Sequence, residues 1–202
     1  MLFRSPESWL TTTTGAEPMK VAGTTEYFDK FAAPVLAQEG NKLPVSMLDP
    51  RGIVPTGTTK FEKRGIAVFV PEWQPDLCVS CGYCSIVCPH AAIRTIYTAD
   101  GTELPEGYVT KKGVGKEFAG MQLRVQVSPM DCTGCGNCAD VCLGKKKDDP
   151  TVKALQMKPL DSQRKEEANW EFAMTVPEIS DRITNKATVK NSQALKIGRA
   201  HV

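Results

Sequence analysis

The chain has 202 residues, enough for one ordinary domain or two small ones. Its hydrophobic content of 41% and charged content of 24% are typical of a globular protein, and the formal net charge of +2 gives no argument for binding nucleic acid or an acidic membrane surface. No apolar run approaches the length of a membrane-spanning helix, and the opening stretch, MLFRSPESWL, lacks the apolar core of a secretory signal. We therefore expect neither a nucleic-acid partner nor a membrane.

Near the N-terminus, residues 25–38 carry the pattern of an amphipathic helix. Thr25 is expected to cap the helix, and Pro34 to split or kink it. The apolar stripe comprises Phe28, Phe31, Ala32, Val35 and Leu36. We interpret it as a packing helix without chemistry.

The following segment, residues 41–63, is rich in Pro, Gly and Thr and predicts a connector with little regular structure. Together with the helix it makes residues 1–63 a connecting arm. The stretch GIAVFVPEW then predicts a strand that Pro71 stops.

Strand patterns flank two cysteine-rich runs. The strand before the first run is followed by one over residues 92–98, and strands over 121–127 and 152–157 flank the second run. The order of strand, cysteine loop, short helix and strand thus occurs twice. It predicts an α+β domain over residues 64–160, with the ferredoxin-like fold of two half-domains related by a pseudo-twofold axis.

The remaining residues are mostly polar. Residues 161–193 predict a linker, anchored by WEFAM and VPEI. The final KIGRAHV resembles the in-frame translation of a common sequencing adapter. We expect residues 194–202 to be non-native and the natural chain to continue past Gln193; an ordinary frayed terminus is the alternative.

All eight cysteines lie in the two runs, and each run has the spacing C-x2-C-x2-C-x3-C. This spacing is typical of the bacterial-type ferredoxin run that binds a 4Fe–4S cluster. Three thiolates two residues apart wrap one cluster, whereas the fourth lies on the short helix that follows and points to the other cluster. We predict that cluster I is bound by Cys78, Cys81, Cys84 and Cys142, and cluster II by Cys132, Cys135, Cys138 and Cys88.

The residues between the cysteines suit such clusters. Gly82, Gly134 and Gly136 allow the backbone to approach the sulfides, to which its N–H groups can donate hydrogen bonds. Pro89 turns the chain out of the first loop, where the second run has Leu143. Water is expected to be excluded by Val79, Ile86, Val87 and Val141.

Two other uses of the cysteines are disfavoured. Disulfides suit a secreted protein and join distant segments, whereas here the cysteines are concentrated and a reducing compartment fits better. Structural zinc sites use cysteine pairs separated by a longer spacer. A colourless protein with stoichiometric zinc would reverse the second conclusion.

Other candidate residues carry weaker predictions. His90 is interpreted as a residue beside a cluster or on the surface, and His201 lies in the suspect tail. The lysines at 145–147 are interpreted as a solvated turn, with steering of an acidic partner as the alternative, and Asp131 as a turn residue. We find no P-loop, no G-x-G-x-x-G and no nucleophile–base pair, so no catalytic residue is assigned. The chemistry indicated is one-electron transfer.

Several stretches resemble the pyruvate:ferredoxin (flavodoxin) oxidoreductase family. They include PTGTTKFEKRGIAVFVPEW, CGYCSIVCPHAAIR, GKEFAGMQLRVQVSPMDCTGCGNCADVC and NWEFAMTVPEISDR. The resemblance runs from about residue 23 to residue 193. The chain departs from the family pattern at Leu143, where the family usually has Pro, and at KKKDDPTV, a longer link.

The resemblance implies that this chain is the inserted two-cluster ferredoxin-like domain of a large enzyme. That family decarboxylates pyruvate on thiamine diphosphate, passes the acyl group to coenzyme A, and sends electrons through three 4Fe–4S clusters to ferredoxin or flavodoxin. The resemblance places the thiamine diphosphate and coenzyme A sites in parts absent here, with the thiamine diphosphate domain after the linker. It also implies a homodimer when full length, in the cytoplasm or in a hydrogenosome or other anaerobic mitochondrion-related organelle.

Two rival functions stay open at this point. One is a stand-alone two-cluster ferredoxin, and the other is the ferredoxin subunit of another redox complex. The flanking arms argue against the first, because a minimal carrier needs little beyond the cysteine repeat.

Overall fold

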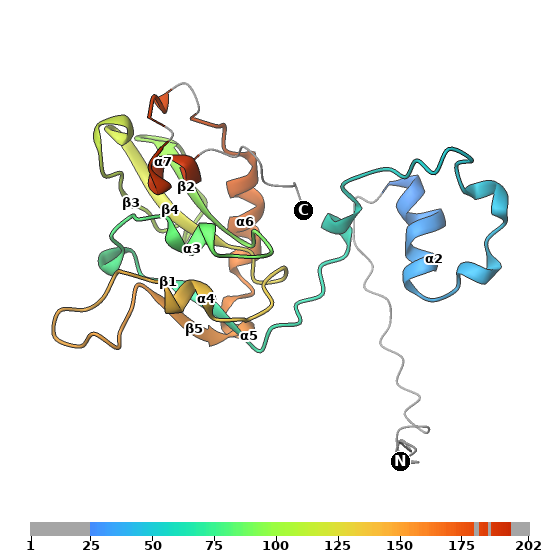
Figure 1. Cartoon of the computed structure of the whole chain (residues 1–202), viewed down its shortest axis with the longest axis horizontal. Helices are drawn as coiled ribbons and strands as arrows, with labels where there is room; N and C mark the ends of the chain where they lie inside the picture. Colours follow the sequence, from blue (N-terminus) through green and yellow to red (C-terminus); the bar gives the residue numbers. More distant parts are fainter. Residues whose placement is uncertain (1–24, 180–181, 186, 195–202) are drawn as a thin grey trace, which may run out of the picture. The chain divides into compact units, whose positions relative to one another are not determined.

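The computed structural model describes residues 25–179, 182–185 and 187–194. The chain divides into two compact units, residues 1–62 and residues 63–202, which are considered separately (Figure 1). Within the described segments, no helix is both long and apolar enough to cross a membrane.

The described part of the smaller unit begins with the expected helix, which is split. A π-helical turn, η1 (Phe28–Ala32), leads into α2 (Ala33–Leu36). The Thr25 hydroxyl caps the start by accepting a hydrogen bond from the backbone N–H of Phe28 at 3.2 Å. Because Pro34 has no N–H, the regular ladder cannot pass through it, and the backbone N–H of Ala33 bonds instead to the carbonyl of Phe28.

Only part of the predicted apolar stripe is buried. The Phe28 ring packs on the Phe61 ring with centroids 5.0 Å apart, whereas Val35 and Leu36 are 45% and 44% exposed. The connector forms short 3-10 turns, as its composition predicted: η2 (Gly40–Lys42), η3 (Val45–Met47) and η4 (Thr58–Phe61). Such turns offer the helix little surface against which to bury its other apolar residues.

The described part of the larger unit contains two antiparallel sheets. One pairs β1 (Phe69–Trp73) with β5 (Leu155–Pro159). The other has the order β2-β4-β3 and consists of β2 (Ile93–Ala99), β4 (Met121–Val127) and β3 (Lys111–Lys112). Short helices α3 (Tyr83–Ile86) and α4 (Asn137–Asp140) follow β1 and β4, so the predicted order of strand, cysteine loop, helix and strand occurs twice (Figure 1).

The boundaries of β1 and β5 differ from the predicted ones. Strands β2 and β4 match within one residue, but β1 begins at Phe69 instead of residue 65 and runs through Pro71. The prediction that Pro71 stops the strand is therefore wrong. Strand β1 has only one neighbour, so a residue without an N–H fits on its free edge. Strand β5 starts three residues later than expected, and β3 was not predicted.

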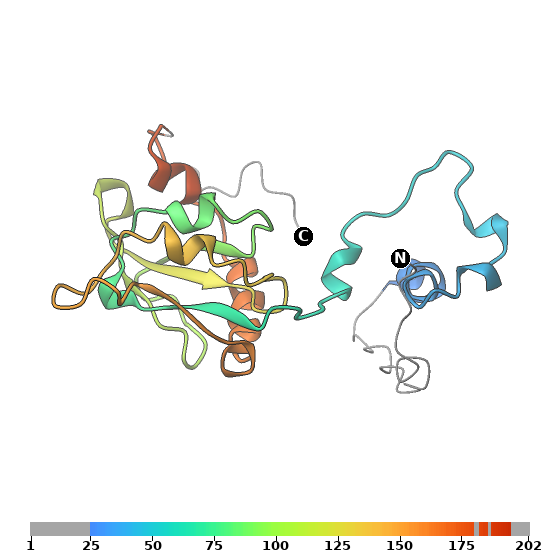
Figure 2. The same cartoon turned by 60° about the horizontal axis from the view of Figure 1, so that its bottom comes forward.

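The three-stranded sheet is covered on both faces. Ile93, Val125 and Val127 pack with cysteines of α3 and α4 on one face. On the other face, Ile96 packs with Ala173 of α6 (Glu166–Thr175). Figure 2 shows α3 and α4 side by side on one side of the strands.

The segment expected to be a linker forms α5 (Leu160–Gln163), α6 and α7 (Val189–Ala194). Its predicted anchors are buried, because Trp170, Ala173 and Val176 are 8%, 0% and 9% exposed. The predicted non-native tail lies outside the described residues apart from Ala194, and so does His201.

Candidate metal centre

The eight cysteines line two separate hollows in the larger unit. Hollow I is lined by Cys78, Cys81, Cys84 and Cys142, and hollow II by Cys88, Cys132, Cys135 and Cys138. Their volumes, which include space open to solvent, are similar, about 370 Å³ and 380 Å³. Each hollow thus receives three cysteines from one run and the fourth from the other run.

The short helices carry the third cysteine of each run. Cys84 lies in α3 and Cys138 in α4, whereas Cys88 and Cys142 follow the ends of these helices. The expectation that the fourth cysteine lies on the helix is therefore wrong. Each helix is a single turn and ends before that cysteine, which lies on the connection to the next strand.

Backbone amides approach sulfur in the same way in both loops. The Ser80 N–H donates to the Cys78 Sγ at 3.4 Å, and the Gly134 N–H donates to the Cys132 Sγ at 3.4 Å. Both donors have left-handed backbones, with φ of 58° at Ser80 and 73° at Gly134. A Cβ on Gly134 would also lie 2.8 Å from the Phe69 carbonyl oxygen, so this site requires glycine for two reasons.

The apolar walls come mainly from the strands. Ile93, Val125, Val127 and Leu155 are buried beside Cys84 and Cys138. Of the residues predicted to exclude water, Val87 is partly buried there, but Val79, Ile86 and Val141 are 56%, 49% and 37% exposed. Val79 nevertheless lines hollow I, whereas Ile86 and Val141 line neither hollow. The prediction is wrong for Ile86 and Val141, because loops and single-turn helices have no strict inward periodicity. The strand patterns of β2 and β4 were the better signal.

Burial and mutual repulsion oppose ionisation of the thiols. Burial, followed by the charges of Cys132 and Cys88, raises the pKa of Cys138 to about 12. Burial, followed by Cys78 and Cys81, also raises the pKa of Cys84 far above its usual range, and burial raises that of Cys132. Thiols whose ionisation is opposed in this way become thiolates only beside positive charge, so metal binding to them must release protons.

This donor set fits a 4Fe–4S cluster in each hollow. Such clusters are bound by four cysteine thiolates, accept hydrogen bonds at sulfur and are tuned by burial. Both hollows supply four cysteines, an amide beside a sulfur and apolar walls. Among the described residues, no three His, Cys, Asp or Glu side chains are grouped as ligands of a single metal ion.

Two lysines that the sequence analysis did not identify stabilise the cysteine segments. The Lys111 Nζ donates to the carbonyls of Cys78 at 2.5 Å and Pro75 at 3.0 Å. The Lys153 Nζ donates to the carbonyls of Ala139 at 2.8 Å and Asp140 at 2.9 Å, at the end of α4. Lys111 lies 33 residues from Cys78, and no local pattern signalled this contact.

Asp131 does more than form a turn. Its carboxylate lies 2.6 Å from the Nζ of Lys63, which also pairs with Glu167 at 2.8 Å. Burial lowers the pKa of Lys63, but hydrogen bonds to the two carboxylates outweigh this effect and leave the pKa above its ordinary value. The residue before Cys132 is therefore anchored to two distant segments.

The two hollows differ in their cover. Helix α7 lies against the loop of hollow I, because a Cβ on Gly82 would come within 3.4 Å of the Gln193 side chain. The Thr95 hydroxyl donates to the Gln193 carbonyl at 2.8 Å. In hollow II, Cys135 and His90 are exposed.

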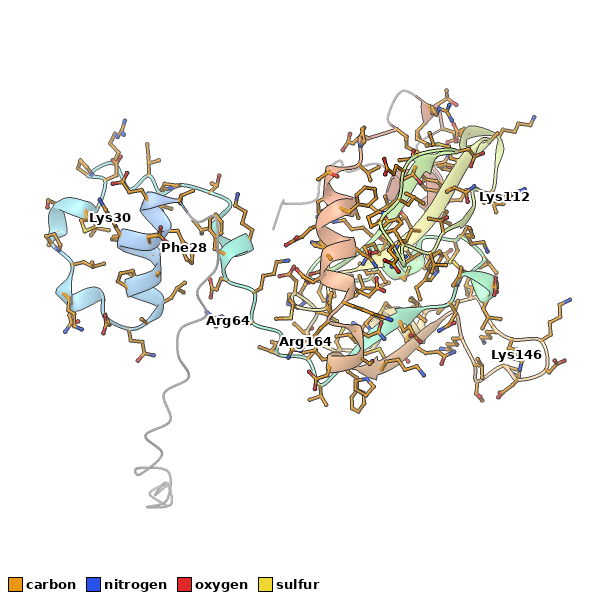
Figure 3. The ribbon with its side chains drawn as sticks, turned by 180° about the vertical axis from the view of Figure 1, so that it is seen from behind. Phe28, Lys30, Arg64, Lys112, Lys146 and Arg164 are labelled. Carbon is orange, nitrogen blue, oxygen red and sulfur yellow. The ribbon has the colours of Figure 1, made fainter. Side chains whose placement is uncertain are left out.

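The remaining candidates lie on the surface. The lysines at 145–147 are exposed on the loop between α4 and β5, and Figure 3 shows Lys146 pointing away from the body of its unit. Their exposure fits a solvated turn, and among the described residues no hydrogen bond or ion pair of their side chains is seen.

Two known protein families match separate parts of the chain. Residues 71–143 match a family described as a 4Fe–4S dicluster domain, which includes all eight cysteines. Residues 14–67 match a family described as a domain of unknown function.

Curated relatives match most of this chain. It is 50% identical to pyruvate:ferredoxin oxidoreductase of Moorella thermoacetica over 95% of its length, and 46% identical to pyruvate-flavodoxin oxidoreductase of Enterobacter agglomerans over 79%. It is 42% identical over 83% of its length to the mitochondrial pyruvate dehydrogenase [NADP(+)] of Euglena gracilis. The chain spans only 16%, 13% and 9% of these three relatives.

Proposed function

We propose that this chain, which carries a 4Fe–4S dicluster domain and whose homologues are pyruvate:ferredoxin and pyruvate-flavodoxin oxidoreductases, is the electron-relay part of such an enzyme. The observation that carries the proposal is the division of eight cysteines into two four-cysteine hollows of similar volume. Bound 4Fe–4S clusters supply one-electron chemistry.

We propose crossed ligation within this domain. Cluster I is assigned to Cys78, Cys81, Cys84 and Cys142, and cluster II to Cys132, Cys135, Cys138 and Cys88. The membership of the two hollows supports this assignment. The twofold occurrence of strand, loop, helix and strand, with β1 paired to β5 and β2 to β4, supports a pseudo-twofold ferredoxin-like fold.

The residues of the chain hold and insulate the two groups. The cysteine thiolates bind iron, the amides of Ser80 and Gly134 lie beside sulfur, and the strand walls exclude water. The two hollows lie next to each other, because α3 contacts α4 and each hollow is lined by one cysteine from the other run. Adjacent sites allow an electron to pass from one to the other.

For the whole enzyme, we infer oxidation of pyruvate with ferredoxin or flavodoxin as acceptor, because the relatives' names state these reactants. The thiamine diphosphate and coenzyme A sites are assigned to other parts of that enzyme, and a homodimer in the cytoplasm or an anaerobic organelle is the inferred assembly and location. The stand-alone ferredoxin is not favoured, since relatives match up to 95% of the chain within much longer enzymes.

The test is an anaerobic iron and sulfide count on the purified chain, with EPR after reduction. We expect about eight irons and eight sulfides per chain and a spectrum of two magnetically coupled reduced clusters. Zinc without sulfide would refute the electron-relay function. Four irons would refute the assignment of two clusters.

A further inference from the structure

Two buried polar groups without a partner lie at hollow I. Ser80 is 5% exposed, and neither its hydroxyl nor the indole N–H of Trp73 has a hydrogen-bond partner among the residues that the structure describes. Both residues line hollow I. Among the buried side-chain polar atoms that lack a partner in the described part of the chain, only these two belong to residues lining a cysteine hollow.

Such groups are costly unless something accepts their hydrogen bonds. A hydroxyl or indole N–H removed from water loses its hydration, and buried polar groups in folded proteins nearly always have a partner. Trp73 also borders a neighbouring polar hollow lined by Gln163 and Glu166, but its N–H bonds to neither of them. Both donors are therefore available to a sulfur-rich group bound in hollow I.

The second cysteine loop provides an internal comparison. Ser80 and Gly134 each lie two residues after the first cysteine of their runs, with the same left-handed backbone and the same 3.4 Å contact to sulfur. A serine is less suited than glycine to a positive φ. No backbone requirement accounts for serine at position 80, so its side chain is the difference between the two loops.

We propose that the Ser80 hydroxyl and the Trp73 indole N–H donate hydrogen bonds to sulfur of the cluster in hollow I and raise its reduction potential. This inference rests on the proposed two-cluster function. Reduction adds a negative charge to a cluster, and donors at its sulfurs stabilise that charge. Hollow II has glycine at the position equivalent to Ser80, so the two clusters are tuned differently.

The test compares four substitutions in the cluster-loaded chain. Ser80→Gly removes the hydroxyl at a backbone that suits glycine, and Trp73→Phe removes the N–H while keeping an aromatic ring. Ser85→Ala is the matched serine control, since its buried hydroxyl already donates to the Ile93 carbonyl at 2.9 Å. Trp170→Phe is the tryptophan control, because Trp170 is buried but lines neither hollow.

EPR-monitored redox titration measures the two midpoint potentials in each variant. We expect S80G and W73F to make the same one of the two potentials more negative, with a larger shift in the double variant and no shift in either control. Pulsed EPR after exchange into D₂O is expected to show several deuterons coupled to the reduced cluster, because the backbone N–H of Ser80 also exchanges. S80G should remove the coupling of the hydroxyl deuteron, and W73F that of the indole deuteron.

Each outcome is decisive. Unshifted potentials in S80G with full iron content would overturn the role of Ser80, and the same result in W73F would overturn that of Trp73. If S80G loses iron, Ser80→Ala repeats the test with the Cβ retained. A wild-type chain without two clusters would instead refute the proposed function, so the two failures are distinguishable.

Discussion

Gly134 allows a quantitative test of how closely the cysteine loop of hollow II packs. In Gly134→Ala, the new Cβ would lie 2.8 Å from the Phe69 carbonyl oxygen and 3.2 Å from the Ala67 Cβ, at a φ of 73°. The left-handed backbone costs about 1–2 kcal/mol for alanine. Overpacking against a strand backbone adds about 1–3 kcal/mol.

Two other glycines separate these contributions. Gly136 has a φ of 81° with nothing within 4 Å of a Cβ, so Gly136→Ala should cost only the backbone strain, about 1–2 kcal/mol. Gly144 has no left-handed backbone, but its Cβ would lie 2.3 Å from the Leu77 carbonyl oxygen. Gly144→Ala therefore imposes a clash beside hollow I without that strain.

The assay is the anaerobic iron-to-protein ratio after desalting, together with the thermal unfolding midpoint. We expect G134A to lose iron from hollow II and G144A from hollow I, each falling from about eight irons toward about four. G136A should keep both clusters and lower the midpoint least. If G134A retained its iron and unfolded at the same temperature as G136A, the close approach to Phe69 would not constrain the loop.

Three further predictions concern residues that brace the cysteine segments. Lys111→Met should release the carbonyls of Cys78 and Pro75 and lower iron content, whereas Lys112→Met, at the exposed neighbouring position (Figure 3), should not; equal iron counts in the two variants would contradict this. Lys63→Met should lower stability at neutral pH by about 1.5–3 kcal/mol through loss of charged hydrogen bonds. The pKa of Lys63 is raised in the folded protein, so Lys63 contributes fully to the free energy of unfolding below its usual pKa of 10.5. This stabilisation is lost as pH rises through the pKa of Lys63 in the folded protein. Unfolding measured across alkaline pH should show this loss only in the wild type. Glu117 accepts hydrogen bonds from Thr184 and Asn185, which lower its pKa below 4.5. These hydrogen bonds to the segment that leads to α7 should therefore weaken as pH falls through the pKa of Glu117 in the folded protein. Hydrogen exchange of α7 should report that weakening, and Glu117→Gln should abolish its pH dependence.

Sequence patterns located the elements with a clear local pattern of residue types. Strand β4 alternates apolar and polar residues, strand β2 is rich in β-branched and aromatic residues, and the predicted boundaries of both were within one residue. The helix over residues 25–38 was also recognised, and Pro34, expected to split or kink it, is preceded by a π-helical turn. The limits of β1 and β5 were missed, because sheet pairing and not local preference sets them.

The site was predictable to the extent that it is encoded in spacing. The four-residue sets predicted for the two clusters are the sets that line the two hollows. The lysine contacts that stabilise the cysteine segments could not be predicted, because Lys63 and Lys111 contact partners that lie 68 and 33 residues away in the sequence. The unpartnered groups of Ser80 and Trp73 could not be foreseen either, since burial of a single atom depends on packing that no motif specifies.

Strand register explains why each hollow receives a cysteine from the other run. Ile93 pairs with Val127, Cys88 lies five residues before Ile93, and Cys132 lies five residues after Val127, so the antiparallel pairing brings Cys88 to the second run. At the other sheet, the Ala154 N–H donates to the Gly144 carbonyl at 2.9 Å and the Gln74 N–H donates to the Ala154 carbonyl at 2.7 Å.

These two bonds place Gly144, and with it Cys142, beside the start of the first run. The link KKKDDPTV does not disturb this arrangement, because Lys145 bridges Lys153 and the intervening residues form a hairpin. The link therefore lies outside the register that positions the cysteines. Shortening that hairpin should leave the membership of both hollows unchanged, whereas a one-residue insertion between Cys88 and Ile93 should displace Cys88 from hollow II. An iron count that fell in the first variant and not in the second would show that the register does not position these cysteines.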